Sequence, residues 1–313
     1  MFEIKRYEPS HEQAWNDFVA RSKNGTFLFD RRFMDYHSDR FADSSLMILR
    51  KGRIYALLPA NRVGDTLHSH QGLTYGGLLT DAKATAEGVM EAFGALNAWL
   101  RNEGVRRVTY KAMPWIYHRL PAEEDLYALT QVCHARLLTR EISSTILLQQ
   151  PLRFTESRKS GLRKALREGL YMEDSGDLAA FWQMLDDNLA SRHHTHPVHS
   201  LDELRLLQGR FPQQIHLYLI YNKEKEPVGG TWVFDTGQVV HTQYIASTEE
   251  GKAHGALDLL FDELINRRYR EGIYLDFGKS TEEGGRVLNE HLIFQKEGFG
   301  GRGVCYDTYE WEP

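Results

Sequence analysis

The chain contains 313 residues, of which 42% are hydrophobic and 26% are charged, and its formal net charge is −5 at pH 7. This length exceeds what one hydrophobic core needs and suits two domains, and the composition is that of an ordinary globular protein. The negative charge excludes a global basic field that would attract nucleic acid, so we expect no DNA partner. The two cysteines, Cys133 and Cys305, are too distant in sequence to suggest a disulfide framework or a zinc knuckle.

The N-terminal residues MFEIKRYEPS lack the apolar core of a secretion signal. No run of the chain approaches the roughly 18 apolar residues of a membrane-spanning helix. We therefore expect a cytoplasmic chain without a membrane span, which would meet any lipid or envelope precursor from the cytoplasmic side.

The first half begins with a helix at 10–20, where Ser10 and Gln13 form a capping box. A β-hairpin is expected at 45–59, because Lys51-Gly52 separates two apolar runs. Segment 67–79 should be a strand, although glycines and histidines interrupt it. The half is completed by an amphipathic helix at 86–103, a strand at 106–112, a proline-started helix at 121–130 and strands within 137–148.

The second half repeats this order of elements. It comprises a hairpin at 215–221 and 227–234, a strand at 239–246, a polar loop at 247–254, a helix ending at Gly272, a strand at 273–277, a helix through 287–292 and a last strand within 303–311. Residue identities do not repeat, so the duplication is one of architecture. We expect a mixed α/β (α+β) fold of two tandem domains, residues 1–150 and 151–313, each a central mixed sheet flanked by helices.

Segment 239–278 is the centre of the second half. Its helix carries apolar residues three or four apart, on one face: Leu257, Leu260, Phe261, Leu264, Ile265 and Tyr269. A strand, a polar loop and a helix N-terminus in succession can hold a phosphate, because the first helical N–H groups and the helix dipole favour an anion. A strand–helix–strand unit that binds nothing is the alternative.

A basic segment, 153–168, precedes this unit. It contains six cations in sixteen residues of an acidic protein: Arg153, Arg158, Lys159, Arg163, Lys164 and Arg167. The segment is either a solvated helix face or a helix that faces phosphate at the junction of the two domains.

Segment 239–278 resembles the donor-binding unit of the GNAT acyltransferase superfamily. The superfamily loop reads Gln/Arg-x-x-Gly-x-Gly/Ala, and here Lys252, Gly255 and Leu257 stand at its three key positions, of which Gly255 matches. The basic helix, the duplicated order of elements and the stretch FQKEGFG at 294–300 resemble the FemAB-like branch, whose members carry two such domains in tandem. Its Phe-Lys-x-x-Phe-Gly turn is shifted here, with Gln295 before Lys296.

This resemblance implies an N-acyltransferase whose first domain holds the acceptor and whose second binds the donor. The expected reaction moves an acetyl-type acyl group from acyl-CoA to an amine of a polar acceptor, such as a sugar-nucleotide or cell-envelope precursor. A FemAB-type aminoacyltransferase that uses aminoacyl-tRNA is the alternative, which the absence of the helical-hairpin arm disfavours. A non-catalytic ligand-binding module with a decayed donor loop is a third hypothesis. No tightly bound cofactor is expected, since the donor is a co-substrate.

The resemblance also assigns site residues. The main-chain N–H groups of Tyr244, Ile245 and Ala246 would polarise the donor carbonyl, and the donor-binding residues would be Ile245, Ala246, Lys252, Gly255 and Ala256. The catalytic candidates are Asp276 as base or acceptor-orienting group, Tyr244 as general acid, and Lys279 as a contact to a carbonyl or phosphate oxygen. Alternatively, Asp276 only caps the turn at 278–280.

Segment 67–79 is the predicted acceptor side, because glycines in a strand often mark the close approach of a ligand. The acceptor contacts would be His70, Gln71, Tyr75 and Lys111. A bulged strand with structural histidines is the alternative.

Segment 191–200 concentrates four histidines beside Arg192. We expect a loop whose Arg192 and His193 contact an anionic acceptor, or a loop that is merely solvated. A zinc site of His193, His194, His196 and His199 is the third possibility, and we disfavour it because no cysteine or carboxylate shares the stretch. We therefore predict no metal.

Overall fold

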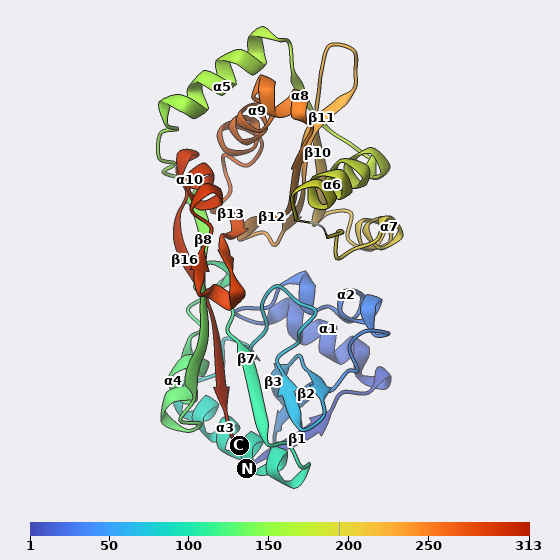
Figure 1. Cartoon of the computed structure of the whole chain (residues 1–313). Coiled ribbons are helices and arrows are strands. Elements are labelled where there is room, and N and C mark those ends of the chain that lie inside the picture. Colours follow the sequence, from blue (N-terminus) through green and yellow to red (C-terminus); the bar gives the residue numbers. More distant parts are fainter. Residues whose placement is uncertain (194) are drawn as a thin grey trace. The chain divides into compact units, whose positions relative to one another are not determined.

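The computed structural model describes residues 1–193 and 195–313, without the side chains of residues 192 and 193. The chain forms two compact units (Figure 1), which are described separately. The first comprises Met1–Glu141, Glu282–Val287 and Cys305–Pro313, and the second comprises Ile142–Thr281 and Leu288–Val304. Strands β8 (Arg136–Leu147) and β16 (Arg302–Trp311) are therefore each divided between the two units.

The first unit contains two groups of strands. One has the order β1-β2-β3-β6 and is antiparallel, and the other has the order β4-β5-β7-β16, with β5 and β7 parallel. The strands are β1 (Phe2–Arg6), β2 (Leu46–Arg50), β3 (Arg53–Leu58), β4 (Asn61–Val63), β5 (Thr66–His68), β6 (Leu79–Thr80) and β7 (Arg107–Lys111). The α-helices are α1 (Glu12–Arg21), α2 (Arg31–Met34), α3 (Ala86–Asn102) and α4 (Glu124–Gln131). Single 3-10 turns lie at Pro9–His11, Phe27–Phe29, Asp35–His37, Trp115–Tyr117 and Glu283–Gly285.

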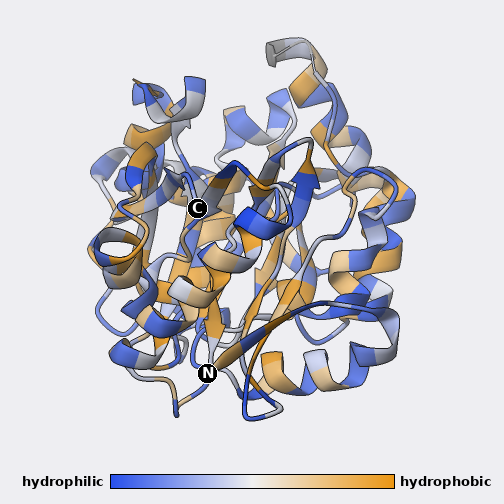
Figure 2. Ribbon diagram, turned by 90° about the horizontal axis from the view of Figure 1, so that it is seen from below, coloured by the Kyte–Doolittle hydropathy of each residue, from blue (hydrophilic) through white to orange (hydrophobic). Residues whose placement is uncertain are grey.

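Helix α3 organises the core of this unit. Thr85 caps its N-terminus by accepting a hydrogen bond from the Gly88 N–H. One face of the helix is fully buried, through Val89, Phe93, Leu96 and Leu100. Figure 2 shows the corresponding alternation of hydrophobic and hydrophilic residues along the helices of the chain.

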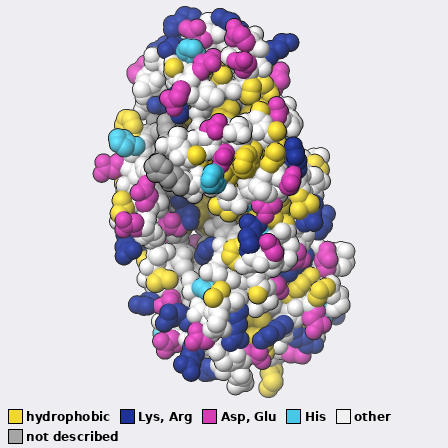
Figure 3. All heavy atoms as spheres, turned by 45° about the vertical axis from the view of Figure 1, so that its right-hand side comes forward, with side chains coloured by type: hydrophobic (Ala, Val, Ile, Leu, Met, Phe, Trp, Pro, Cys, Tyr) yellow, Lys and Arg dark blue, Asp and Glu magenta, His cyan; other side chains and the backbone are white. Residues whose placement is uncertain are grey.

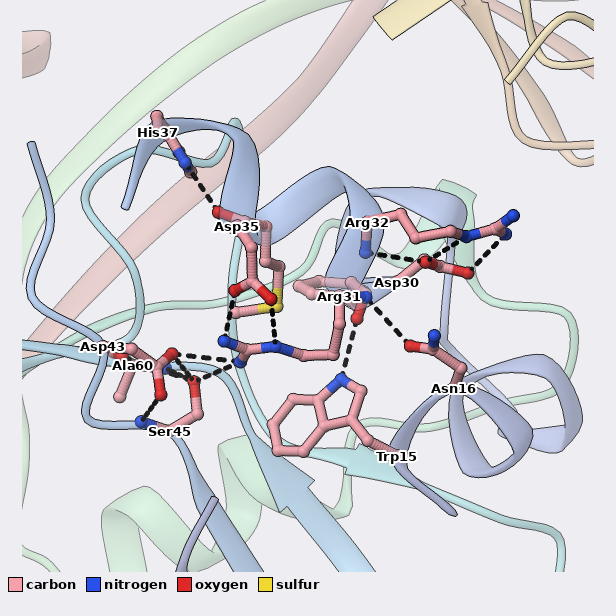
Figure 4. A network of polar contacts seen from close by, with 12 residues as sticks. Trp15, Asn16, Asp30, Arg31, Arg32, Asp35, His37, Asp43, Ser45 and Ala60 are labelled. Atoms are coloured by element: carbon pink, nitrogen blue, oxygen red, sulfur yellow. Dashed lines mark hydrogen bonds and ion pairs between the residues drawn. The ribbon is translucent and has the colours of Figure 1, made fainter. Parts of the chain in front are cut away.

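The buried guanidinium of Arg31 connects several segments of the first unit (Figure 4). It forms ion pairs with Asp35 and, at 3.0 Å, with Asp43, and its Cζ lies 3.8 Å from the centroid of the Tyr7 ring. A buried cation is tolerated here because carboxylates and an aromatic face replace its hydration. Asp30 caps α2 by accepting a hydrogen bond from the Arg32 N–H.

Segment 67–79 is not the continuous strand that was expected. Only β5 and β6 at its two ends are strands, and residues 69–78 form turns and irregular structure. The Lys111 Nζ donates hydrogen bonds to the carbonyl oxygens of His70, Gln71 and Leu73, so a side chain satisfies main-chain groups that a neighbouring strand would otherwise pair.

The second unit is built on strands in the order β8-β13-β12-β11-β10-β9, of which β12 and β13 are parallel and the other pairs antiparallel. The strands are β9 (Tyr171–Asp174), β10 (Ile215–Tyr221), β11 (Pro227–Asp235), β12 (Val239–Ser247) and β13 (Tyr274–Lys279). The helices are α5 (Glu156–Arg167), α6 (Leu178–His193), α7 (Leu201–Arg210), α8 (Glu249–His254), α9 (Ala256–Glu263), a π-helical turn (Leu264–Arg268) and α10 (Glu290–Gly298). The short strands β14 (Thr281–Glu282) and β15 (Val287–Leu288), each divided between the two units, pair with each other.

Helices cover both faces of this sheet. Val233 of β11 belongs to the core that α9 completes, whereas the indole of the preceding residue, Trp232, donates a hydrogen bond to Gln208 of α7. Because neighbouring residues of a strand point to opposite faces, α9 lies on one face and α7 on the other.

From Glu249 onwards the expected polar loop at 247–254 is helix α8, whereas Ser247 ends β12. Thr248 caps this helix by accepting a hydrogen bond from the Gly251 N–H. Gly255 then adopts a left-handed conformation, with φ of 78°, and joins α8 to α9. The first residues of segment 191–200 are likewise helical, since α6 continues to His193.

Gly255 provides a test of this packing. A Cβ at this position would lie 2.4 Å from the carbonyl oxygen of Gly161 in α5, and its φ of +78° disfavours any other residue. We expect Gly255→Ala to lower the free energy of unfolding by roughly 2–4 kcal/mol, through left-handed strain and forced separation of the helices. Urea denaturation monitored by circular dichroism would measure this.

Gly209→Ala is the matched control, because Gly209 lies in helix α7 of the same unit and a Cβ there would meet nothing within 4 Å. This control should be equally stable or more stable by up to about 1 kcal/mol. Equal stability of Gly255→Ala and the wild type would contradict the steric argument.

Candidate active site

Strands β12 and β13 separate at their C-terminal ends. Their parallel register covers Val239–His241 on β12 and Tyr274–Asp276 on β13, and among the described residues it stops there. A β-bulge follows at once, because Trp232 pairs with Tyr244 and Val233 with Thr242, which leaves Gln243 as the extra residue. A bulge bends and twists its strand, so β12 continues along β11 while β13 continues along β8. The result is a fork between two parallel strands.

The main-chain groups that face this fork follow from the hydrogen bonds at the end of β12. The Thr248 N–H donates to the Val228 carbonyl of β11, whereas the Ser247 N–H donates to Asn188 Oδ1 of α6 at 3.3 Å. Consecutive residues of an antiparallel strand direct their N–H groups to alternate sides. The Ile245 N–H therefore faces the fork, and the N–H groups of Tyr244 and Ala246 face β11.

A pocket of about 420 Å³ lies at the fork. Most of its wall is apolar, and helices α6, α9 and α10 contribute to it together with both strands. The lining residues are Leu185, Asn188, Leu189, Ile245, Ala246, Ser247, Lys252, Leu257, Phe261, Phe277, Leu292, Gln295, Lys296 and Phe299. A mostly apolar pocket with a few polar groups is typical of a ligand site.

Three of the predicted donor-binding residues, Ile245, Ala246 and Lys252, line this pocket. The other two do not. Gly255 packs against the backbone of Gly161, and Ala256 is fully buried in the core. A glycine is needed at position 255, which matches the superfamily loop, because α5 approaches its backbone closely.

Asp276 lies at the point where the strands separate and is fully buried. Ser143 and Thr145 of β8 donate hydrogen bonds to its Oδ1, the latter at 2.8 Å, and His241 Nδ1 lies 3.0 Å from its Oδ2. Three side chains thus orient this carboxylate and compensate for its burial. Lys279, at the end of β13, is exposed.

Lys296 of α10 is the one lysine of the pocket wall that is buried. Its Nζ donates hydrogen bonds to the Gly278 and Lys279 carbonyl oxygens and to Ser280 Oγ, at 2.8–2.9 Å. Burial lowers the pKa of Lys296 to about 8, against the opposing influence of the Asp276 carboxylate. Sequence patterns did not select Lys296 as a site residue, although the motif FQKEGFG contains it.

Tyr244 lies on the α7 side of the sheet with a partner that the sequence did not suggest. Its hydroxyl is 2.6 Å from His199 Nδ1, and its ring stacks on Trp232 with centroids 6.1 Å apart. Burial raises the pKa of Tyr244 to about 12. His199 had been named only as a potential zinc ligand.

The predicted acceptor residues of the first unit are mostly internal. His70 and Tyr75 are each only 2% exposed, and burial lowers the pKa of His70 to about 3. Lys111 is bonded to the three carbonyl groups described above. Gln71 is exposed, and its side chain accepts a hydrogen bond from Asn61. The side chains of Arg192 and His193 lie outside the described part of the structure.

The basic segment is helix α5, and part of its charge is used internally. Arg158 pairs with Asp258 at 2.9 Å and lies over the ring of Phe299. Lys159 pairs with Glu156, whereas Arg163 is exposed. On the face drawn in Figure 3, basic and acidic side chains are interspersed.

The histidine-rich segment makes two described contacts. His196 Nδ1 lies 2.7 Å from Asp186, and His199 bonds Tyr244. Within residues 1–193 and 195–313, no three histidine, cysteine or acidic side chains are grouped as metal ligands would be. The zinc hypothesis also involved His193 and His194, whose side chains are outside the description.

The lowered pKa of Lys296 can be tested by stability. The folded state disfavours the charged form of Lys296. The resulting loss of folding stability is complete below pH 8, and it disappears as the pH rises towards 10.5, the ordinary pKa of a lysine. We expect the difference in free energy of unfolding, wild type minus Lys296→Met, to rise by about 3 kcal/mol between pH 8 and pH 10.5. Urea titrations at several pH values would measure it, and a constant difference would contradict the assignment.

The chain is similar to known proteins in part of its sequence and in its fold. Residues 154–284 match the family model described as the acetyltransferase (GNAT) domain. No curated protein is similar enough in sequence to count as a match. Similar solved structures include FemX (11% identity, TM-score 0.68, covering 99% of this chain and 97% of that one) and L-PGS from Bacillus licheniformis (13%, 0.57, 97% and 92%). A tandem GNAT protein of the clavulanic acid biosynthesis pathway is also similar (12%, 0.54, 100% and 98%).

The predicted family resemblance, fold class and transferase class are thereby confirmed. The chain carries a GNAT acetyltransferase domain in residues 154–284, is a transferase, and has the mixed α/β fold of the tandem GNAT proteins.

Proposed function

We propose that this chain transfers an acyl group from acyl-CoA to an amine of a polar acceptor, with the donor bound in the fork between β12 and β13. The observation that carries the proposal is the Ile245 N–H, which faces a pocket beside strands that have separated. In this proposal residues 151–313 bind the donor, and residues 1–150 form the acceptor side.

The chemistry requires few groups. A fixed N–H donor at the fork would polarise the donor carbonyl and stabilise the oxyanion that forms when the amine attacks. The charge of Lys296 in the same wall would favour that developing negative charge, since the surroundings are poor in water. Tyr244 would supply a proton to the leaving group, and Asp276 would hold the fork and orient its neighbours. Lys279 would contact a donor oxygen at the rim.

The donor is the first open choice. Lys252 of α8 lines the pocket. It would bind a donor phosphate if its ion pair with Glu249 opened. Glu249 and Glu250 in the first turn of α8 already complement its dipole, which weakens this helix N-terminus as a phosphate site. An aminoacyl-tRNA donor is the alternative, and the fold shared with FemX supports it.

The acceptor would be a sugar-nucleotide or cell-envelope precursor met in the cytoplasm. The fold shared with FemX and L-PGS supports this class. No helix of the described residues is long and apolar enough to cross a membrane. The third candidate, a module that binds a ligand without catalysis, would follow if no donor reacted.

Ile245→Pro tests the oxyanion donor. Proline at this position removes the Ile245 N–H, which faces the fork, and leaves the hydrogen bonds between β12 and β11 in place. We expect a fall in transfer rate of about 10²- to 10³-fold with the fold retained. The assay is release of free CoA from acetyl-CoA in the presence of a panel of primary amines, with circular dichroism to follow folding.

Ala246→Pro is the matched control, since the Ala246 N–H faces β11 and its loss should destabilise the sheet. A folded Ile245→Pro variant with full activity would contradict the proposal. Thermal shifts with CoA, acetyl-CoA and charged tRNA distinguish the candidates. Stabilisation by CoA species supports the acyl-CoA donor, stabilisation by charged tRNA alone supports the alternative, and no response supports the binding module.

A further inference from the structure

A second polar group lies on β12, one residue before Tyr244. It belongs to the side chain of Gln243, the extra residue of the bulge. Its carbonyl oxygen, Oε1, is buried and accepts no hydrogen bond from any described group. None of the roles proposed above uses this atom.

Such an orphaned carbonyl oxygen is costly. A buried polar group without a partner lacks the compensation for lost hydration, and native proteins keep few of them. A hydroxyl can rotate and an imidazole can change tautomer, but an amide oxygen can only accept. Turning the amide over would leave its NH₂ group unpaired at the same place. The position therefore calls for a ligand that donates a hydrogen bond.

We propose that Gln243 Oε1 binds the amine of the acceptor, an inference that rests on the proposed function. An amine offers the N–H donors that this oxygen lacks. Gln243 precedes Ile245 by two residues, so along the strand their Cα atoms are at most roughly 7 Å apart. An amine held by the Gln243 side chain is therefore adjacent to a donor carbonyl held by the Ile245 N–H.

The neighbouring pair can accept the proton that an ammonium group must lose. The Tyr244 hydroxyl and His199 Nδ1 are 2.6 Å apart, and His199 is buried. One ammonium proton passes to the Tyr244 oxygen while the Tyr244 proton passes to Nδ1, which leaves a neutral amine, a neutral tyrosine and an imidazolium. The amine nitrogen then bonds the acyl carbon and the carbon–sulfur bond of the thioester breaks. The thiolate takes the Tyr244 proton, the second proton of the attacking nitrogen replaces it on the Tyr244 oxygen, and the proton on His199 is released to water.

The test uses ¹⁵N-labelled full-length protein without any acyl donor. Two NMR signals are followed, the Gln243 side-chain NH₂, identified by its loss in Gln243→Met, and the Ile245 backbone N–H. Methylammonium is the probe, and tetramethylammonium, which has the same charge and no N–H, is the control. We expect saturable shifts of both signals with methylammonium and none with tetramethylammonium.

In Gln243→Met the response of the Ile245 signal to methylammonium should weaken at least tenfold, while the melting temperature stays equal or rises, because the orphaned oxygen is gone. Three results would overturn the proposal: equal shifts with tetramethylammonium, an undiminished response in Gln243→Met, or a response of Gln243 to CoA but not to the amine. An intact amine response in a protein that transfers no acyl group would instead refute the proposed function alone.

Discussion

The separation of β12 from β13 is the constraint on which the rest of the site depends. Two parallel strands that pair only up to His241 and Asp276 cannot fill the space beyond that point with their own hydrogen bonds. The bulge at Gln243 directs β12 along β11, and the buried Asp276, bonded from β8 and β12, fixes the base of the fork. The main chain of β12 consequently borders a pocket. The Ile245 N–H is available there without the loss of a hydrogen bond between strands.

The surrounding helices are held by close packing and buried charge rather than by phosphate-binding geometry. Gly255 is required because α5 approaches to the backbone of Gly161, and Arg158 of that helix pairs with Asp258 and covers Phe299. Part of the positive charge of α5 therefore serves packing within the second unit. Lys296, in contrast, lies in the pocket wall. Burial lowers its pKa, and its amino group is a cation beside the fork.

The order of elements could be predicted because it depends on local periodicity. The amphipathic helix α3, the hairpin of β10 and β11 and the strands β12 and β13 all occur close to where alternation and helical spacing indicated. Several local predictions were wrong. Helix α1 begins at Glu12 without the Ser10–Gln13 capping box, and Val287–Leu288, expected in a helix, form strand β15. Two further differences have a clear physical cause. Residues 249–254 form a helix that Thr248 caps, and the Lys111 side chain bonds three carbonyl groups of segment 67–79, which is not a continuous strand. The first depended on a capping hydrogen bond, and the second on a contact between residues about forty positions apart.

Sequence patterns were sufficient to predict the family resemblance, the mixed α/β class and the strand that carries Ile245 and Ala246, because these follow from motifs and from the period of apolar residues. The tertiary structure alone decided which N–H group faces the fork, that Lys296 and His199 join the candidate site, and that Gly255 serves packing. These facts depend on side chains brought together from distant parts of the chain, such as Asn188 with Ser247 and His199 with Tyr244. Local patterns do not encode such contacts, since they arise only when helices pack on the sheet.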